Sequence, residues 1–78
     1  MMNTYIVNLV LKDVTERNLS WVKDSDHKDS WLIYDSNIGH EKYIVFEDYV
    51  FHLFRYSEGK EVLISSYDSL HDAIEGLK

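Results

Sequence analysis

The residues of this chain best suited to bind a metal or to transfer a proton are its four histidines, His27, His40, His52 and His71. A compact zinc site usually pairs two histidines four residues apart on a helix, or combines histidine with cysteine, and the sequence has neither arrangement. His52 differs from the others because an alternating strand pattern places it between Val50 and Phe54. We therefore predict no metal and no cofactor, and a hydrogen-bonded core or interface histidine at position 52.

The acidic segment DSDHKD, residues 24–29, begins like a calcium-binding loop, because one residue separates Asp24 from Asp26. The pattern then fails, since Lys28 occupies the third ligand position and Asp29 stands where a sharp-turn glycine is needed. A lysine at a ligand position would repel the cation. We predict a solvated acidic loop with no bound calcium.

The sequence contains no motif for nucleophilic or phosphate chemistry. It has no nucleophile elbow and no glycine-rich phosphate loop, and only 3 glycines in all. The adjacent carboxylates Glu47 and Asp48 would point to opposite faces of a strand, so they could not share a proton. We predict that the protein is not an enzyme. A small hydrolase that uses His52 or His71 with a nearby carboxylate is the least favoured alternative.

The charge is acidic and unevenly distributed. The chain has a formal net charge of −6, and residues 24–48 hold seven acidic residues against two lysines. Binding to a phosphate backbone requires clustered Lys and Arg that displace counterions, and here the basic residues are few and scattered. We therefore predict a protein partner with a basic surface, and no direct contact with nucleic acid.

Composition also bears on the compartment. The chain has no cysteine, so it needs no oxidising environment for disulfides. No run of residues approaches the roughly 20 apolar residues of a membrane span, and the apolar N-terminal segment lacks a basic leader and a cleavage site. We predict a cytoplasmic protein without membrane contact, folded as a single small globular domain over residues 1–78.

Five segments have the β-branched and aromatic composition of strands, namely residues 4–11, 30–36, 42–46, 49–56 and 61–65. Turn signals separate several of them. Asn37 or Gly39 is suited to a positive φ angle, and Gly59 lies in a clear hairpin signal, SEGK. The dipeptide between residues 46 and 49 lacks the Gly or Asn of a favoured two-residue hairpin, so it predicts a bulge or a wider turn.

Two elements outside these strands complete the predicted fold. Residues 14–22 read as a short helix, with a rival interpretation in which residues 20–23 are a strand that forms a hairpin with residues 30–36. The C-terminal segment is clearer: four apolar residues have helical spacing and Gly76 is suited to end the helix, the four being Leu70, Ala73, Ile74 and Leu77. The sequence thus predicts an α+β fold, with a mostly antiparallel sheet of 4–5 strands and a C-terminal helix of about nine residues packed on one face.

The segment YVFHLFRY, residues 49–56, is apolar on both of its alternating faces. A C-terminal helix can cover only one of them, which leaves Tyr49, Phe51 and Leu53 on the other as a possible second apolar interface. Three arrangements would solve this: residues 14–22 fold over the second face, the sheet curls and closes, or another chain covers the face.

The acidic loop and the aromatic residues that flank it together suggest a function in binding. We predict a non-enzymatic module whose partner-binding residues are Asp24, Asp26, Asp29, Asp35, Trp21, Trp31 and Tyr34. Such a surface suits an inhibitor that occupies the nucleic-acid-binding groove of an enzyme. Phage-encoded inhibitors of host defence nucleases have this general character, which is a likeness of type and not of motif. The alternative is a homo-oligomeric structural or accessory protein, such as a homodimer, that associates through an apolar face of the sheet.

Overall fold

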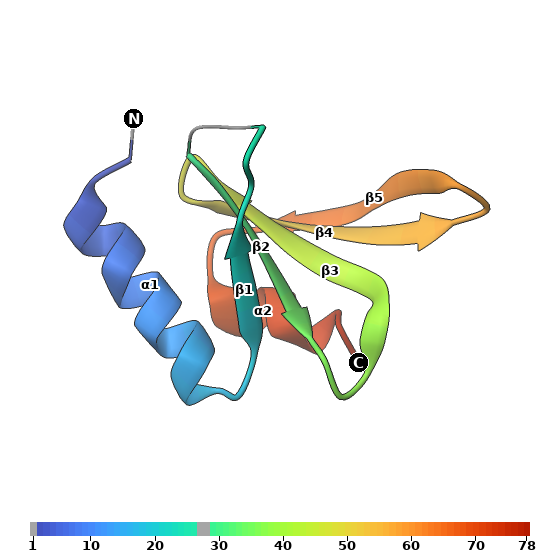
Figure 1. The fold of residues 1–78 in the computed structure, drawn as a ribbon, viewed down its shortest axis with the longest axis horizontal. Helices are drawn as coiled ribbons and strands as arrows, with labels where there is room; N and C mark the ends of the chain where they lie inside the picture. Colours follow the sequence, from blue (N-terminus) through green and yellow to red (C-terminus); the bar gives the residue numbers. More distant parts are fainter. Residues whose placement is uncertain (1, 27–28) are drawn as a thin grey trace.

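The computed structural model describes residues 2–26 and 29–78, so His27 and Lys28 of the acidic segment lie outside the described residues. In chain order the elements are α1 (Thr4–Glu16), β1 (Ser20–Lys23), β2 (Ser30–Asp35), β3 (Gly39–Glu47), β4 (Val50–Ser57), β5 (Lys60–Tyr67) and α2 (Leu70–Glu75). The strands form one antiparallel sheet in which each strand pairs with the next along the chain. Figure 1 shows this twisted sheet with a helix at each end of the chain and the β4–β5 hairpin projecting away from both helices. The predicted α+β class and antiparallel sheet are confirmed.

The prediction of a strand over residues 4–11 is wrong, because this segment is the first part of α1. The Asn3 side chain caps the helix by accepting a hydrogen bond from the backbone N–H of Tyr5, at 2.8 Å. Val7, Leu11 and Val14 lie three or four residues apart and are buried together. Their burial against the sheet outweighs the strand propensity of the β-branched residues.

The helix ends at a left-handed residue that turns the chain into β1. Asn18 has a φ angle of 60°, and its N–H donates to the carbonyl of Thr15, while the N–H of Leu19 donates to the carbonyl of Val14. These two bonds satisfy carbonyl groups that the helix end leaves without partners. The prediction of a helix over residues 14–22 is therefore wrong, and the rival hairpin of β1 with β2 is confirmed.

Two of the observed turns agree with the turns predicted from the sequence, and a third differs. Gly39 and Gly59 have positive φ angles, as predicted for the turns that precede β3 and β5. Asp48 and Tyr49 also have positive φ angles, of 51° and 64°, so β3 and β4 are joined by a tight two-residue turn of the type I′ kind. Aspartate is one of the non-glycine residues that adopt this conformation most readily, whereas tyrosine rarely does so. The Tyr49 hydroxyl accepts a hydrogen bond from the Asn3 N–H, which ties the turn to the start of α1.

The C-terminal helix is confirmed, although α2 is shorter than predicted and ends at Glu75. Ser69 caps it by accepting a hydrogen bond from the N–H of Asp72, at 3.2 Å. Gly76 ends the helix with an ordinary negative φ angle, so its role differs from that of a left-handed cap. A Cβ atom at this position would overlap the Leu53 side chain, and glycine therefore allows the helix end to lie against β4.

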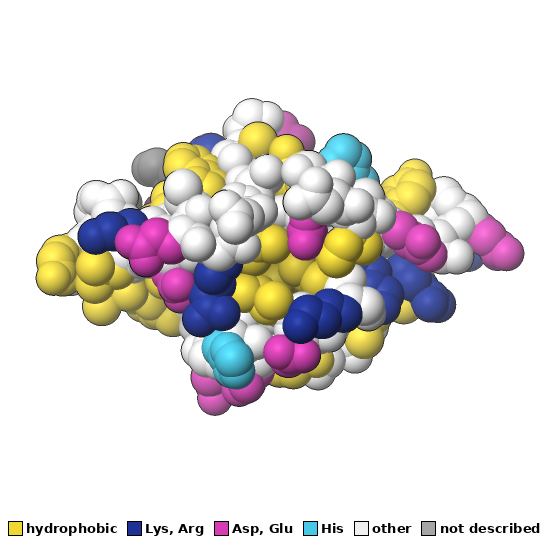
Figure 2. All heavy atoms as spheres, turned by 90° about the horizontal axis from the view of Figure 1, so that it is seen from below, with side chains coloured by type: hydrophobic (Ala, Val, Ile, Leu, Met, Phe, Trp, Pro, Cys, Tyr) yellow, Lys and Arg dark blue, Asp and Glu magenta, His cyan; other side chains and the backbone are white. Residues whose placement is uncertain are grey.

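Both helices pack on the same face of the sheet, which we call the inner face. Its buried residues from the strands are Ile33, Ile44, Phe46, Phe51 and Leu53. Cross-strand register aligns them, since Ile44 lies opposite both Ile33 and Leu53, and Phe46 lies opposite Phe51. Apolar side chains of α1 and α2 join them in one core cluster. Figure 2, which views the molecule from below, shows hydrophobic side chains at the centre with lysine, arginine and acidic side chains around them. Within the part of the chain that the structure describes, no helix is long and apolar enough to cross a membrane.

Candidate functional site

The opposite face of the sheet, which we call the outer face, has no helix over it. Register places large apolar and aromatic side chains from all five strands there, among them those of Val22, Leu32, Tyr34, Tyr43, Val45, Phe54, Tyr56 and Leu63. None of them is buried, and Tyr56 and Leu63 are more than half exposed. Alternation along each strand produces this arrangement, because neighbouring residues point to opposite faces and both sets are apolar. The outer face is therefore an apolar surface that the sheet presents to solvent.

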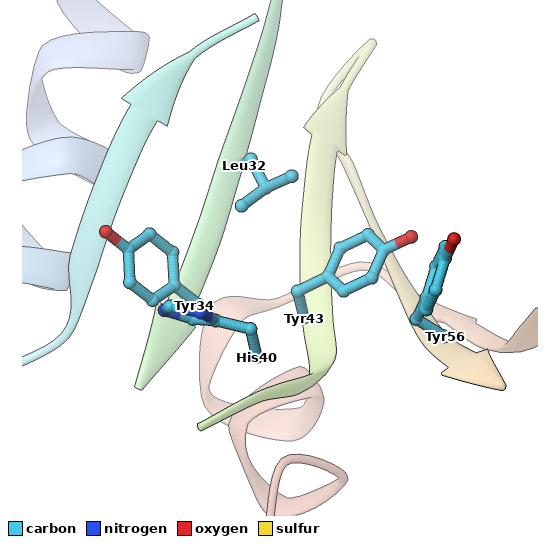
Figure 3. Close-up of a pocket in the computed structure, with 5 residues that line it drawn as sticks. All are labelled: Leu32, Tyr34, His40, Tyr43 and Tyr56. Atoms are coloured by element: carbon cyan, nitrogen blue, oxygen red, sulfur yellow. The ribbon is translucent and has the colours of Figure 1, made fainter. Parts of the chain in front are cut away.

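Three strands contribute to a groove on the outer face, which we call the tyrosine groove. It has a volume of about 450 Å³ and is lined by Leu32, Tyr34, His40, Tyr43 and Tyr56. Figure 3 shows the aromatic rings standing around the Leu32 side chain, with Tyr34 and His40 on one side and Tyr43 and Tyr56 on the other. Tyr34 and His40 meet edge to face, with ring centroids 4.8 Å apart. This geometry is favourable for aromatic pairs and holds both rings in place.

Tyr43 occupies the centre of the outer face and has two partners. Its ring stacks on that of Phe54, with centroids 5.8 Å apart, and its hydroxyl donates a hydrogen bond to the carboxylate of Glu61. Burial of the hydroxyl raises the pKa of Tyr43 well above its usual range, and the Glu61 carboxylate raises it further by accepting the proton and by its negative charge. Tyr43 therefore remains a neutral hydrogen-bond donor throughout the physiological pH range.

A second groove on the same face carries acidic residues, and we call it the acidic groove. Its volume is about 230 Å³, and it is lined by Asp24, Ser30, Val45, Glu47, Phe54 and Glu61. The hydrogen bond between Tyr43 and Glu61 connects the two grooves. Carboxylates are thus placed next to the aromatic rings of the outer face.

His52 also lies on the outer face, where its Nδ1 atom is 2.7 Å from the Ser66 hydroxyl oxygen. It is half-buried and hydrogen-bonded, as predicted. A serine and a histidine at this distance match two members of a catalytic triad. A triad also requires a third group that orients the histidine ring, and catalysis requires donors for the oxyanion. Among residues 2–26 and 29–78, no carboxylate bonds the second ring nitrogen of His52, and no cluster of three or more potential metal ligands is present.

The structure divides the predicted partner-binding residues between the two sides of the sheet. Trp21 lies opposite Ile33 and therefore belongs to the inner face, and Trp31 packs on the core residue Phe46. Asp29 lines a groove beside α1 with both tryptophans. This corrects the expectation of one continuous surface, because both tryptophans lie on the inner face, where Trp31 packs against the core and Trp21 is 40% exposed beside α1.

The remaining predicted residues lie on or near the loops. Tyr34 lines the tyrosine groove and Asp24 lines the acidic groove, so these two do lie on the outer face. The Asp24 carboxylate accepts a hydrogen bond from the N–H of Asp26, and the Asp35 carboxylate accepts one from the N–H of Asn37. Both are local turn contacts of a kind that Asp commonly makes.

The predicted second interface of Tyr49, Phe51 and Leu53 requires a correction as well. Phe51 and Leu53 are buried in the core beneath the helices, and Tyr49 lies in the turn before β4. The prediction placed these residues on the uncovered face because it treated residues 4–11 as a strand and did not include α1 as a cover. The uncovered side of β4 is the one that carries His52, Phe54 and Tyr56.

Most residues of the tyrosine groove are absent from the predicted partner-binding residues, namely Leu32, His40, Tyr43 and Tyr56. A signal was present, since Tyr43 and Val45 alternate with core residues on one strand and Phe54 and Tyr56 do so on the next. No family model, no curated protein and no solved structure matches this chain. The geometry of the outer face is therefore the basis for a functional proposal.

Proposed function

We propose that the protein is a non-enzymatic binding module that uses the outer face of its sheet to contact a partner protein. The observation that carries this proposal is the position of both helices on the inner face, which leaves a set of half-exposed aromatic and aliphatic side chains facing solvent. Exposed apolar patches of this kind are typical of protein interaction sites, and Tyr is among the residues enriched there. An antiparallel sheet of five strands provides a rigid support for such a surface.

The charge of the molecule supports a basic partner. The net charge is −6, and the carboxylates of the acidic groove lie beside the apolar residues of the outer face. Carboxylates in this position complement lysine and arginine side chains, and they also repel acidic surfaces. We infer that the partner surface is basic, as in an enzyme that binds nucleic acid, and that the module acts in the cytoplasm as an inhibitor of the kind found among phage anti-defence proteins.

A matched pair of substitutions tests this proposal. Leu63 on the outer face and Leu9 on the solvent side of α1 are 53% and 50% exposed, so Leu→Lys costs a similar amount of stability at either position. We expect the Leu63→Lys variant to lose its partner, because the new charge repels a basic surface, and the Leu9→Lys variant to keep it. The measurement is a tagged pull-down from a bacterial lysate, with quantitative mass spectrometry of the retained proteins.

The salt dependence of the interaction provides the second part of this test. The affinity of the purified partner should fall by about tenfold or more between 50 and 300 mM salt, because ionic screening weakens contacts between exposed charges. Equal retention by the two lysine variants, or an affinity that does not change with salt, would contradict the proposed binding mode.

A second candidate function, self-association, is favoured by the edge of the sheet. β5 is an edge strand, and its three consecutive apolar residues Val62, Leu63 and Ile64 are all about half exposed. An exposed apolar edge can pair with a strand of another chain, although the register shift beside Ile64 is a device that commonly limits such pairing. In a two-fold antiparallel dimer the charged start of β5, Lys60 and Glu61, would lie opposite the uncharged end of the partner strand.

This candidate predicts a dimer in light scattering at micromolar concentration. Replacement of Val62 by lysine should then yield a monomer, because a lysine on an edge strand disfavours pairing with a strand of another chain. A wild-type protein that remains monomeric over the same concentrations would eliminate self-association.

A further inference from the structure

We propose that the tyrosine groove is a binding site for a cationic side chain, the guanidinium of arginine or the ammonium of lysine, on a basic segment of the partner. This inference rests on the proposed function and specifies the chemistry that the outer face recognises. The groove has a volume of about 450 Å³ and is lined by aromatic rings and an apolar floor. The Glu61 carboxylate lies nearby, at the Tyr43 hydroxyl.

The aromatic rings are the first reason for this assignment. The rings of Tyr34, Tyr43 and Tyr56 come from three adjacent strands and line the groove together with His40. Figure 3 shows Tyr34 and His40 on one side of Leu32 and Tyr43 and Tyr56 on the other. The face of an aromatic ring carries negative charge density and attracts a cation within about 6 Å of its centre. A groove lined by several such rings therefore favours a cation over a neutral group of the same size.

Two of the three tyrosine rings are also held in place before a ligand arrives. Tyr34 is fixed by its edge-to-face contact with His40, and Tyr43 is fixed by stacking on Phe54 and by its hydrogen bond to Glu61. A site with ordered side chains loses less conformational entropy when the ligand binds. Leu32 forms an apolar floor that suits the methylene stem of a lysine or arginine side chain.

The charges around the groove are the second reason. Among the described residues that line the tyrosine groove none is lysine or arginine, and the Glu61 carboxylate lies at the Tyr43 hydroxyl. The acidic groove begins at this same hydrogen bond and continues toward Asp24 and Glu47. A segment with one cation in the tyrosine groove could therefore place a second one beside the acidic groove. A neutral ligand, such as a proline-rich segment, would gain nothing from these carboxylates.

A small cation and its neutral isostere test the site without any partner. The probes are choline and 3,3-dimethylbutan-1-ol, which have the same shape and differ in charge, with N-acetyl-arginine methylamide as a third ligand. Binding is followed by NMR titration of the purified protein. We expect choline and the arginine derivative to shift the signals of the tyrosine groove with millimolar affinity, and the neutral alcohol to bind at least about fivefold more weakly.

Substitutions at Tyr56 separate the contribution of the ring from that of the hydroxyl. Tyr56 is exposed, so its replacement should leave the fold unchanged. Tyr56→Phe should keep choline affinity within about twofold, and Tyr56→Leu should reduce it by about threefold to tenfold, because only the second change removes an aromatic face. Tyr5→Leu, on the exposed side of α1, is the control and should have no effect.

Three results would overturn this inference: equal binding of choline and its neutral isostere, equal effects of Tyr56→Phe and Tyr56→Leu, or a clear preference for a neutral proline-rich peptide. Such a failure is distinguishable from a failure of the proposed function. Choline binding requires no partner, and the Leu63→Lys pull-down does not depend on what occupies the tyrosine groove. If the Leu63→Lys variant loses the partner and the wild-type protein does not bind choline, the proposed binding function stands and only the cation site is rejected.

Discussion

The Phe46→Ala substitution is expected to lower the free energy of unfolding by about 3–5 kcal/mol, whereas Phe54→Ala is expected to lower it by only about 1–2 kcal/mol. The two phenylalanines lie on adjacent strands and face opposite sides of the sheet. Phe46 is 1% exposed and stacks on Phe51, with ring centroids 4.6 Å apart. Phe54 is half-buried on the outer face, so its removal creates no closed cavity.

Urea unfolding followed by circular dichroism measures this difference, and the two variants serve as controls for each other. A loss of 3–5 kcal/mol is a large part of the stability of a small domain, which is typically about 5–15 kcal/mol. Equal losses for the two variants would mean that the outer face is covered as completely as the inner face. A second copy of the chain would then be the cover, and the loss for Phe54→Ala should shrink when the protein is diluted.

Features that depend on a few neighbouring residues could be predicted from the sequence. The turn between β4 and β5 was identified from Gly59, and α2 from the helical spacing of Leu70, Ala73 and Leu77. In both cases the residues that determine the conformation lie within a few positions of one another. Local backbone preference and packing agree there, so a sequence pattern is sufficient.

The first helix could not be recognised because its local composition and its packing disagree. Residues 4–11 contain β-branched and aromatic residues that favour a strand, and the buried stripe of α1 becomes regular only when Val14 is included. The sequence interpretation placed an element boundary within that stripe. Tertiary burial decides the conformation here, and it involves residues of the sheet that are distant in sequence.

The turn between β3 and β4 was missed for a similar reason. Asp48 and Tyr49 adopt positive φ angles, which aspartate tolerates and tyrosine disfavours. The turn lacks the glycine that usually follows aspartate in a two-residue hairpin, so the local signal is weak. Contacts distant in sequence accompany this backbone conformation. Tyr49 accepts a hydrogen bond from Asn3, and its N–H lies 3.2 Å from the sulfur of Met2.

The candidate site was predicted on the wrong face because α1 was not predicted. The sequence shows that both faces of β4 are apolar, but it does not show which face the helices cover. Without α1, the sequence pattern predicts that the side of β4 that carries Phe51 and Leu53 is exposed. With α1 in place, these residues belong to the core, and the tyrosines of the opposite face become the candidate binding residues.

Two leucines in α1 offer a direct test of this helix, because helix and strand predict different outcomes for the same substitution. In α1, Leu11 is buried in the core and Leu9 is 50% exposed. We expect Leu11→Ala to lower the free energy of unfolding by about 2–4 kcal/mol, since it removes a core side chain and leaves a cavity. Leu9→Ala should cost about 1 kcal/mol or less, because alanine favours the helix and little buried surface is lost.

A strand at the same position would make the two variants alike, because residues two positions apart point to the same face of a strand. Chemical denaturation of both variants under the same conditions therefore separates the two structures without further structural work. A loss for Leu9→Ala as large as that for Leu11→Ala would reject α1 as the cover of the inner face. It would also restore Phe51 and Leu53 as candidates for an exposed interface, so the position of the binding surface depends on this comparison.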